Sequence, residues 1–458
     1  MQNKKKPLIK VLDCTLRDGG YYNNWCFEDF LVKNYIQSIN KSKIDFIEIG
    51  FRNLKEKSYL GPYAYSKENV LEKFFNKKAK NIAVMIDGKD FIGNNNDIKK
   101  KIDTLFLPKK DSLVSIVRIA TQLSQLKYCR FLSNILKELG YFVVLNLMQI
   151  GNKSNQEIED AGKLINSWNS IEVLYFADSI GCMSPELVKK TIFLLRKNWK
   201  KEIGIHAHDN KGMALQNTLT ALENGATWLD STVDGMGRGA GNAKTELLLL
   251  ELNKKKNIRY YNTQEIFRLS TNHFKKLKTQ YLWGTNIYYY LAAEFNIHPT
   301  YIQKMLNETK YSNTDILKAI NHMKKFSAAS FDESLLTNFI SNKKTNRSHW
   351  KPTGWCKGKN ILLIGGGNSI KNFNNQIINF IKIKKPIVLS INIQKSLNKK
   401  YINGYIGANK ARILMDSLEY SKSSKYIYTS KDAFINILNT KEKMKLKLRD
   451  YGIRIKNI

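Results

Sequence analysis

Eight short apolar segments alternate with longer amphipathic stretches over the first 256 residues, and this alternation predicts a (β/α)8 TIM barrel. The apolar segments are rich in β-branched residues and almost uninterrupted, which is typical of parallel strands buried on both faces. A doubly wound open sheet is the alternative, but eight strand–helix units favour the closed barrel. The expected strands cover residues 9–16, 44–51, 81–88, 114–120, 141–148, 171–179, 203–209 and 227–235.

The stretches between the expected strands carry apolar residues at helical spacing. Residues 28–42, 123–139 and 184–199 show this pattern most clearly. Ser184 before Pro185 predicts a helix N-cap followed by proline at the first helical position. Helices that surround a barrel bury one apolar stripe each, so the spacing agrees with the predicted fold.

Two further regions are expected after the barrel. Residues 257–345 contain several amphipathic segments and are predicted to be helical, and the polar run 341–355 is the expected linker. The segment "GKNILLIGGGNSIKN" (358–372) places a glycine cluster between a strand and a helix, which indicates a Rossmann-like unit. It does not satisfy GxGxxG, so NAD is not expected. The predicted domains are a catalytic barrel at 1–256, its helical extension at 257–345 and a small Rossmann-like α/β domain of unknown role at 346–458.

The chain is strongly basic, with a formal net charge of +36 from 75 Lys and Arg against 39 Asp and Glu. Such an excess is compatible with a nucleic-acid or membrane partner. The lysines are spread along the whole chain, however, and no nucleic-acid-binding motif accompanies them, so neither partner is expected. The five cysteines form no CxxC pair and the N-terminus does not read as a signal peptide, which together predict a cytoplasmic location.

Polar residues gather at the carboxyl ends of the expected strands. Active sites of TIM barrels lie at that end, because all eight strands point the same way and their following loops meet there. A random scatter of polar residues would not favour one end of every strand. The residues in question are Asp13, Arg17, Asp18, Glu48, Arg52, Arg118, Asn146, Asp178, Ser179, His206 and His208.

His206 and His208 stand out in the segment "GIHAHDNKG" (204–212), because the chain has only six histidines. Alternate residues of a strand point to the same side, so the two imidazoles are expected to project together. With a carboxylate from another strand they would form a facial site for a divalent metal. The alternative is a pair of structural histidines that are hydrogen-bonded in the core.

Three motifs in order, "LDCTLRDGG" (12–20), "HAHDN" (206–210) and "GMGRGAGNAKTE" (235–246), resemble the metal-dependent lyase and aldolase barrels. That superfamily includes 4-hydroxy-2-oxovalerate aldolase, hydroxymethylglutaryl-CoA (HMG-CoA) lyase, isopropylmalate synthase and homocitrate synthase. The match spans roughly residues 8–255. Its details, "RDGGYYNNW", "FIEIGFR" and "NLMQIG", are most similar to the 4-hydroxy-2-oxovalerate aldolase-like branch that often lies beside polysaccharide biosynthesis genes.

The resemblance implies a set of metal ligands. Asp18 matches the carboxylate ligand, His206 and His208 match the two imidazole ligands, and Asn242 matches a position that contacts the metal in some relatives. Mn or Mg suits the oxygen atoms of a 2-oxo acid substrate, while imidazole ligands also accept Zn, Co or Fe. We therefore expect a divalent metal cofactor.

The resemblance also implies catalytic residues. Arg17 matches the arginine that steadies an enolate oxygen, a role that a fixed positive charge can fill in any enzyme of this chemistry. Glu48 is expected either to orient Arg17 or to contact a water on the metal. The related aldolases usually place a histidine base shortly after the first motif, whereas this chain has Tyr21 and Tyr22 there. A tyrosine, a water or another residue could carry the proton instead.

These expectations combine into a divalent-metal-dependent carbon–carbon lyase, an aldolase that acts through the enolate of a 2-oxo acid such as pyruvate with an aldehyde partner. A Claisen-type acyl-CoA condensing synthase or lyase is the first alternative, and a non-catalytic binding protein with a decayed site is the second. The related aldolases make subunit contacts through their helical region, so a homo-oligomer is expected. Residues 357–458 hold 21 Lys and Arg against 5 Asp and Glu, which suits an anionic ligand, but a plain structural module is equally compatible.

Overall fold

The computed structural model divides into two compact units, Met1–Leu336 and Thr337–Ile458. The predicted boundaries near residues 256 and 345 remain predictions. The structure describes residues 8–54, 59–76, 81–255, 258, 260–308, 311–325, 328–332, 335, 350, 353–367, 369–394, 396–407, 416–429 and 447–450.

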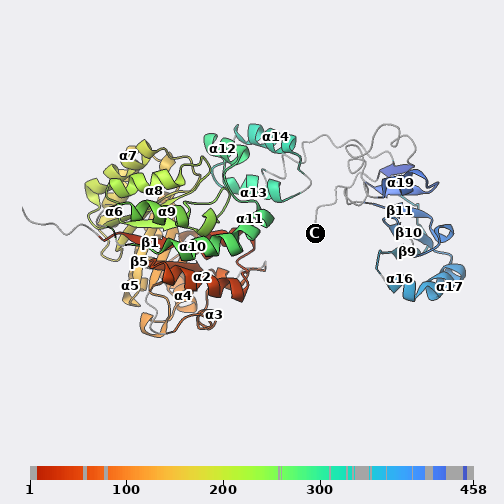
Figure 1. Ribbon diagram of the computed structural model, residues 1–458, viewed down its shortest axis with the longest axis horizontal. Coiled ribbons are helices and arrows are strands. Elements are labelled where there is room, and N and C mark those ends of the chain that lie inside the picture. The colour runs from red at the N-terminus through yellow and green to blue at the C-terminus, as the bar shows by residue number, and fades with distance from the viewer. Residues whose placement is uncertain are drawn as a thin grey trace, which may run out of the picture. The chain divides into compact units, whose positions relative to one another are not determined.

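The first unit contains a closed barrel of eight parallel strands, which confirms the predicted fold (Figure 1). Each strand pairs with the next one along the chain. The ring closes where β1 pairs with β8, with Leu12 opposite Asp230 and Asp13 opposite Ser231. The strands are β1 (Lys10–Asp13), β2 (Phe46–Phe51), β3 (Ile82–Asp87), β4 (Ile116–Thr121), β5 (Phe142–Met148), β6 (Val173–Asp178), β7 (Glu202–Ala207) and β8 (Trp228–Ser231).

Helices surround the barrel and bury their apolar stripes against it. The helix that begins at Pro185 starts as predicted, because the Ser184 side chain accepts a hydrogen bond from the Leu187 N–H at 3.3 Å. The helices are α1 (Thr15–Gly19), α2 (Asp29–Lys41), α3 (Glu68–Leu71), α4 (Asn95–Leu105), α5 (Leu126–Glu138), α6 (Asn155–Asn166), α7 (Pro185–Asn198), α8 (Ala214–Glu223) and α9 (Thr245–Asn253). Short 3₁₀ turns add η1 (Gly20–Tyr22), η2 (Pro62–Ala64), η3 (Gly88–Phe91), η4 (Lys109–Asp111), η5 (Leu123–Gln125), η6 (Ile150–Asn152) and η7 (Val233–Gly235).

Aromatic rings fill the amino-terminal end of the barrel, with the Lys10–Glu202 ion pair beside them. Trp228, Phe46 and Phe142 are each the first residue of a strand, and their rings meet there. The Trp228 ring is stacked 4.7 Å from Phe46 and 5.7 Å from Phe142, measured between ring centroids. The polar residues predicted from the sequence therefore lie in the opposite half of the barrel.

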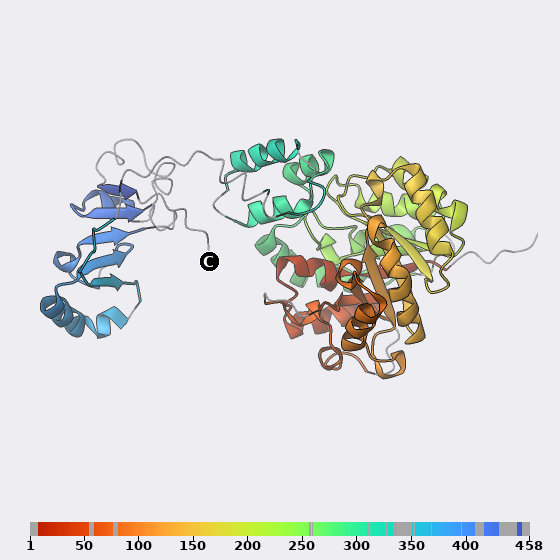
Figure 2. The same ribbon diagram turned by 180° about the vertical axis from the view of Figure 1, so that it is seen from behind.

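The predicted helical layer follows the barrel, and it lies in the same compact unit (Figures 1 and 2). It touches the carboxyl end of the barrel, where the Gln303 side-chain oxygen accepts a hydrogen bond from the Gly239 N–H at 2.9 Å. The Gln303 amide also donates to the Tyr21 carbonyl at 3.1 Å. The elements are α10 (Thr263–Leu269), the π-helical turn η8 (Ser270–Phe274), α11 (Lys275–Tyr281), α12 (Ile287–Glu294), α13 (Pro299–Asn307) and α14 (Asn313–Met323).

The second unit is a small α/β domain, as expected. Its five parallel strands lie in the order β13-β12-β11-β10-β9, so neighbours in the sheet are also neighbours along the chain. The glycine cluster Gly365–Gly367 follows the first of these strands. The elements are β9 (Ile361–Ile364), α16 (Ser369–Asn372), α17 (Asn374–Lys384), β10 (Ile387–Ile391), η9 (Lys399–Tyr401), β11 (Gly404–Ile406), α19 (Ser417–Ser421), β12 (Tyr426–Thr429) and β13 (Leu448–Asp450).

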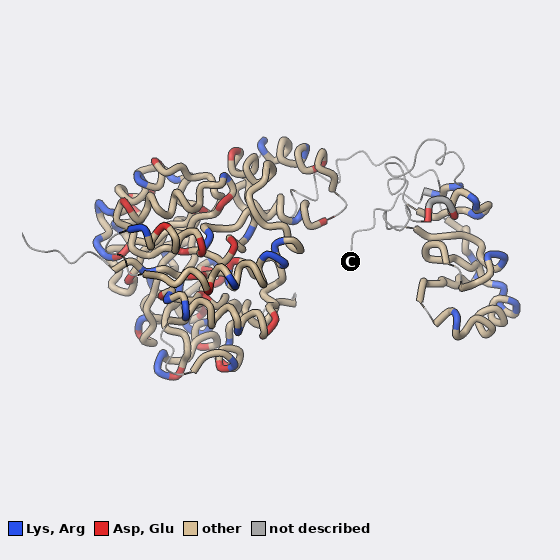
Figure 3. Tube along the Cα trace, in the orientation of Figure 1, with Lys and Arg blue, Asp and Glu red and all other residues tan. Residues whose placement is uncertain are grey.

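Basic residues are spread over the trace of both units, and acidic residues lie among them in the first unit (Figure 3). Along the described stretches, every helix is too short or too polar to cross a bilayer.

Candidate active site

The three side chains predicted to bind a metal lie together at the carboxyl end of the barrel. Asp18 stands in α1 directly after β1, His206 is in β7, and His208 lies just beyond that strand. One ligand atom from each residue can be chosen such that all three lie within 4.8 Å of one another. All three side chains are buried. The structure thus brings the predicted ligands together, and their binding of a metal remains a prediction.

Asn242 completes this group. Its Nδ2 donates to Asp18 Oδ2 at 2.6 Å, and its backbone forms an antiparallel bridge with His208. Its Oδ1 is buried and accepts no hydrogen bond from any described residue, and the same holds for His206 Nε2 and His208 Nδ1. Buried acceptors are normally satisfied in proteins. A set of imidazole nitrogens and amide and carboxylate oxygens fits a divalent cation.

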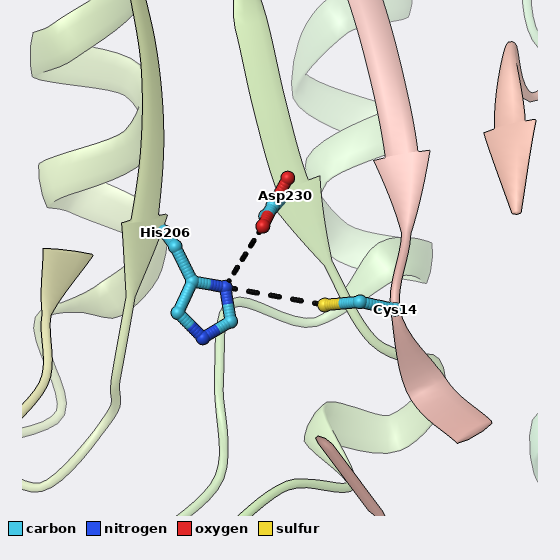
Figure 4. Close-up of side chains that lie close together, drawn as sticks. All are labelled: Cys14, His206 and Asp230. Carbon is cyan, nitrogen blue, oxygen red and sulfur yellow. Dashed lines mark hydrogen bonds and ion pairs between the residues drawn. The ribbon is translucent and has the colours of Figure 1, made fainter. Parts of the chain in front are cut away.

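Asp230 fixes the orientation of His206 (Figure 4). His206 Nδ1 lies 3.0 Å from Asp230 Oδ2, so Nδ1 carries the proton that is donated to this carboxylate. The lone pair of the neutral ring is then on Nε2, which lies 4.0 Å from Asp18 Oδ2. A carboxylate behind a metal-binding histidine is a common way to set its tautomer and ring orientation.

Cys14, His206 and Asp230 form a second group with the spacing of metal ligands. The Cys14 sulfur lies 3.9 Å from His206 Nδ1 (Figure 4). Burial raises the pKa of the Cys14 thiol well above its usual value, whereas a metal requires the thiolate. In addition, Asp230 Oδ2 already accepts from Arg118 Nη2 at 2.7 Å. The group around Asp18 is therefore the better cation site.

Buried ion pairs link the site into a chain of alternating charge from Asp18 to Asp230, and His206 closes it into a circuit that we name the charge ring. Arg17 donates from Nη1 to Asp18 Oδ1 at 2.5 Å and from Nε to Glu48 Oε2 at 2.7 Å. On the other side of Glu48, Arg118 Nη1 lies 3.1 Å from Oε2, and Arg118 Nη2 reaches Asp230. His206 then closes the circuit between Asp230 and Asp18. The charge ring consists of Asp18, Arg17, Glu48, Arg118, Asp230 and His206.

The charge ring holds its members in place more than it stabilises the fold. Arg118 and Glu48 are completely buried, and the Arg118 guanidinium lies 4.4 Å from the centre of the Tyr175 ring. Attraction between buried charges roughly offsets their loss of hydration, but removal of one partner leaves an uncompensated charge and typically costs about 3–5 kcal/mol. Of the two roles expected for Glu48, the structure shows the contact that orients Arg17.

Charges around the site set the protonation of two predicted ligands. Burial on its own raises the pKa of Asp18, but Arg17, followed by the two histidines, lowers it to well below the usual range. Burial also lowers the pKa of His208 well below its ordinary value, despite the opposing effect of Asp18. An ionised carboxylate and a neutral imidazole are the forms that coordinate a metal.

Tyr21 and Tyr22 lie beside the site in η1. The Tyr22 hydroxyl donates to the Gly239 carbonyl at 2.6 Å, so it joins η1 to the loop after β8. Tyr21 keeps 38% of its surface exposed and packs its ring 4.8 Å from that of Trp25. Burial raises the pKa of both hydroxyls, which makes them proton donors and not bases near neutral pH.

Sequence reasoning did not single out Asp230, which orients His206, as a site residue. It noted Arg118 at a strand end but gave it no role. The available signal was chemical: a carboxylate and a guanidinium each interrupt an otherwise apolar, buried strand. Such charges are rarely buried unless they are paired, so each one predicts a partner without saying which.

Comparisons with known proteins agree with this geometry. The profile of the HMGL-like family matches residues 62–272. The 4-hydroxy-2-oxovalerate aldolase of Pelotomaculum thermopropionicum is 32% identical over 261 residues, which cover 54% of this chain and 71% of that relative. The enzyme of the same name from Geobacillus genomosp. 3 is 30% identical over 253 residues, covering 54% of this chain and 72% of the relative. The chain belongs to the HMGL-like family.

Solved structures extend the similarity of this HMGL-like chain. The N-terminal domain of a candidate aldolase from Bacteroides vulgatus is 33% identical, with a TM-score of 0.59 that covers 68% of this chain and all (100%) of that domain. The carboxyl transferase domain of Rhizobium etli pyruvate carboxylase with pyruvate and biocytin has a TM-score of 0.55 at 14% identity, over 74% of this chain and 61% of that one. The second likeness concerns the fold alone. The predicted family and the enzyme class, aldolase or lyase, are thereby confirmed.

Proposed function

We propose that this HMGL-like enzyme is a divalent-metal-dependent aldolase that forms the enolate of a 2-oxo acid such as pyruvate. The proposal depends chiefly on one observation: Asp18, His206 and His208 offer buried ligand atoms within 4.8 Å of one another, while His206 Nε2, His208 Nδ1 and Asn242 Oδ1 have no hydrogen-bond donor among the described residues. A cation would satisfy all of them. Relatives named as 4-hydroxy-2-oxovalerate aldolases support the reaction class.

Asp18, His206 and His208 would hold the ion, with Asn242 Oδ1 as a further ligand. Once bound, a divalent ion acts as a Lewis acid toward the keto and carboxylate oxygens of a 2-oxo acid. We propose Mn²⁺ or Mg²⁺ because these ions prefer oxygen-bearing substrates. The carboxylate of Asp230 keeps the His206 lone pair pointed at this position.

Arg17 is placed to stabilise the enolate oxygen. Two of its nitrogens are tied to Asp18 and Glu48, while Nη2 is buried and has no partner among the described residues. The guanidinium therefore cannot reorganise during the reaction, and its unpaired N–H groups can donate to a developing oxyanion. Loss of one such preorganised donor typically lowers kcat by about 100- to 1000-fold.

The protonated Tyr21 hydroxyl is the proposed donor to the alkoxide that forms when the enolate carbon attacks an aldehyde. This assignment follows from the place of Tyr21 in η1, beside the proposed metal ligands, and from its raised pKa, which keeps the hydroxyl protonated at pH 7. The bond forms between C3 of the 2-oxo acid and the aldehyde carbon, and the aldehyde oxygen takes a proton to become a hydroxyl. In condensation the C3 proton of the 2-oxo acid leaves to water before the bond forms. In cleavage the hydroxyl proton passes to water through the Tyr21 hydroxyl, the carbon–carbon bond breaks, and the enolate takes a proton from water at C3.

Deuterium exchange into the methyl group of pyruvate tests the proposal directly. The full-length protein should catalyse exchange with Mn²⁺ or Mg²⁺, should lose it after chelation, and should recover it when metal is restored. Exchange at an unchanged rate in metal-free protein would contradict the metal role. Thiol release from acetyl-CoA without pyruvate exchange would instead indicate a Claisen-type enzyme, and a failure to bind metal would indicate a decayed site.

A further inference from the structure

Arg238 is a positively charged side chain at the mouth of the barrel for which the enolate step has no use. It lies in the loop between β8 and α9, directly after Gly237. A Cβ atom at Gly237 would lie 2.6 Å from Asp18 Oδ2, so the backbone there touches the proposed metal ligand. Adjacent Cα atoms are about 3.8 Å apart, and Arg238 therefore starts one residue from the reacting centre.

The Arg238 guanidinium is held by neutral groups. Its Nη2 donates to the Ser179 carbonyl at 2.9 Å, and its Nη1 lies 3.3 Å from His298 Nε2. The Tyr21 ring lies 5.8 Å from the guanidinium carbon. His298 stands at the start of α13 with its Nδ1 3.4 Å from the Thr300 N–H, and the single lone pair of the neutral ring accepts from either Thr300 or Arg238. The arginine is thus anchored to the end of β6 and to the helical layer.

Arg238 forms no ion pair in the described part of the chain, although its charge contributes, after Arg17 and the two histidines, to the lowered pKa of Asp18. No described carboxylate lies within 4.0 Å of its guanidinium, in contrast to Arg17 and Arg118, which both pair with carboxylates. Burial, followed by the charge of Arg238, lowers the pKa of His298 to about 2, so this imidazole is neutral at pH 7. The Arg238 Nε is buried and has no partner among the described residues. A fixed guanidinium that has no ion pair and a buried, unpaired N–H can bind an anion.

We propose that Arg238 binds a carboxylate or phosphate group on the aldehyde half of the aldol substrate. This inference rests on the proposed aldolase function. The carboxylate of the 2-oxo acid itself belongs with the metal ligands and Arg17, whereas Arg238 contacts none of the charge ring and is anchored toward the helical layer. The anionic group takes no part in bond formation. It holds the aldehyde carbon against C3 of the enolate, which makes Arg238 a specificity-determining residue.

The test uses matched aldehyde pairs with pyruvate and the Mn²⁺-loaded full-length enzyme. Glyceraldehyde 3-phosphate is compared with glyceraldehyde, and 4-oxobutanoate with butanal, so that each pair differs by one anionic group. The wild type should prefer the anionic member of at least one pair by about 100-fold in kcat/KM, because charge-assisted bidentate contacts are the strong ones. The pair that shows the preference tells phosphate from carboxylate.

Arg238→Gln should reduce that preference to less than about fivefold, and Arg238→Lys should restore part of it because the point charge returns. The preference is a ratio measured on one preparation, so partial loss of folded protein cancels. Arg130→Gln removes the same charge from the exposed side of α5 and should leave the ratio as in the wild type.

Three results separate this inference from the function on which it rests. Wild-type protein that exchanges pyruvate protons but shows no preference for either anionic aldehyde overturns the role of Arg238 alone. A preference that survives Arg238→Gln overturns it as well. Wild-type protein with metal that fails to exchange pyruvate protons overturns the aldolase itself.

Discussion

Both units of this chain are built on parallel strands, yet their strand ends differ in chemistry. The barrel places three carboxylates, two guanidiniums and an imidazole in one buried circuit, the charge ring. In the described part of the second unit, the buried polar residues at or just after the strand ends are neutral: Ser390, Gln394 and Thr429. Parallel strands alone therefore do not make an active site.

The difference follows from closure. In a closed barrel every strand end faces one axis, so α1, which follows β1, can meet side chains from β2, β4, β7 and β8 in the charge ring. In the open sheet the strand order follows the chain order, and it never reverses. Ligands of open α/β sheets bind where the strand order reverses, so this sheet lacks the usual crevice among its described strands.

The largest expected effect concerns Asp18, the carboxylate that belongs both to the proposed metal ligands and to the charge ring. Asp18→Asn should lower pyruvate exchange by about 1000-fold or more, because it removes a metal ligand and the counter-ion of Arg17 together. Metal content measured by elemental analysis should fall in parallel. Asp103→Asn, an exposed change in α4, is the matched control. Retained metal and exchange in the Asp18 variant would move the site elsewhere.

A second pair of variants decides between the two groups that share His206. Asp230→Asn should weaken metal binding by about 10- to 100-fold, because the imidazole of His206 loses the carboxylate that fixes its tautomer. Cys14→Ser should change the affinity by less than about threefold, since a buried thiol is not expected to be a ligand. Metal titration of both variants gives the comparison. Equal losses in the two would favour the cysteine-containing group instead.

Acid should destabilise the first unit through His298. Its folded-state pKa of about 2 lies below the ordinary value of about 6.5, so below pH 6.5 the unfolded chain binds a proton that the folded chain does not. Protonation of His298 therefore leaves the free energy of unfolding unchanged well above pH 6.5 and lowers it as the pH drops through this value. Between pH 7.5 and 5.5, urea unfolding should show the wild type losing about 1 kcal/mol more than His298→Gln. Parallel losses in both proteins would exclude this contribution.

The smallest effect is expected in the second unit. Asn392→Ala or Gln394→Ala should change the rate of pyruvate exchange by less than about twofold, because independent sites do not couple. The same exchange assay measures it, with Asp18→Asn as the positive control. A tenfold loss would show that the open sheet takes part in the reaction after all.

The sequence predicted the barrel well because buried parallel strands leave a direct trace, a run of β-branched residues with polar residues at one end. His206 and His208 were predictable for the same reason, since one strand carries both. The link from Glu48 through Arg118 to Asp230 was not, because it joins three different strands and depends on how they meet across the barrel.

Other features could not be predicted from the sequence. The contact between Arg238 and His298 joins a loop to a helix of the extension 60 positions later, which no local pattern records. The tautomer of His206 depends on which carboxylate lies behind it. The strand order of the second unit depends on which strands pair, and the sequence of a strand does not reveal its position in the sheet.

The stacked rings of Trp228, Phe46 and Phe142 fill the amino-terminal end of the barrel, which leaves the carboxyl end as the way in to the charge ring. Under the proposed function, two reactants would share this entrance. The 2-oxo acid would reach the cation first, and the aldehyde would arrive on top of it. In cleavage the aldehyde would depart before the 2-oxo acid, so the proposed function and this packing together imply an ordered kinetic mechanism.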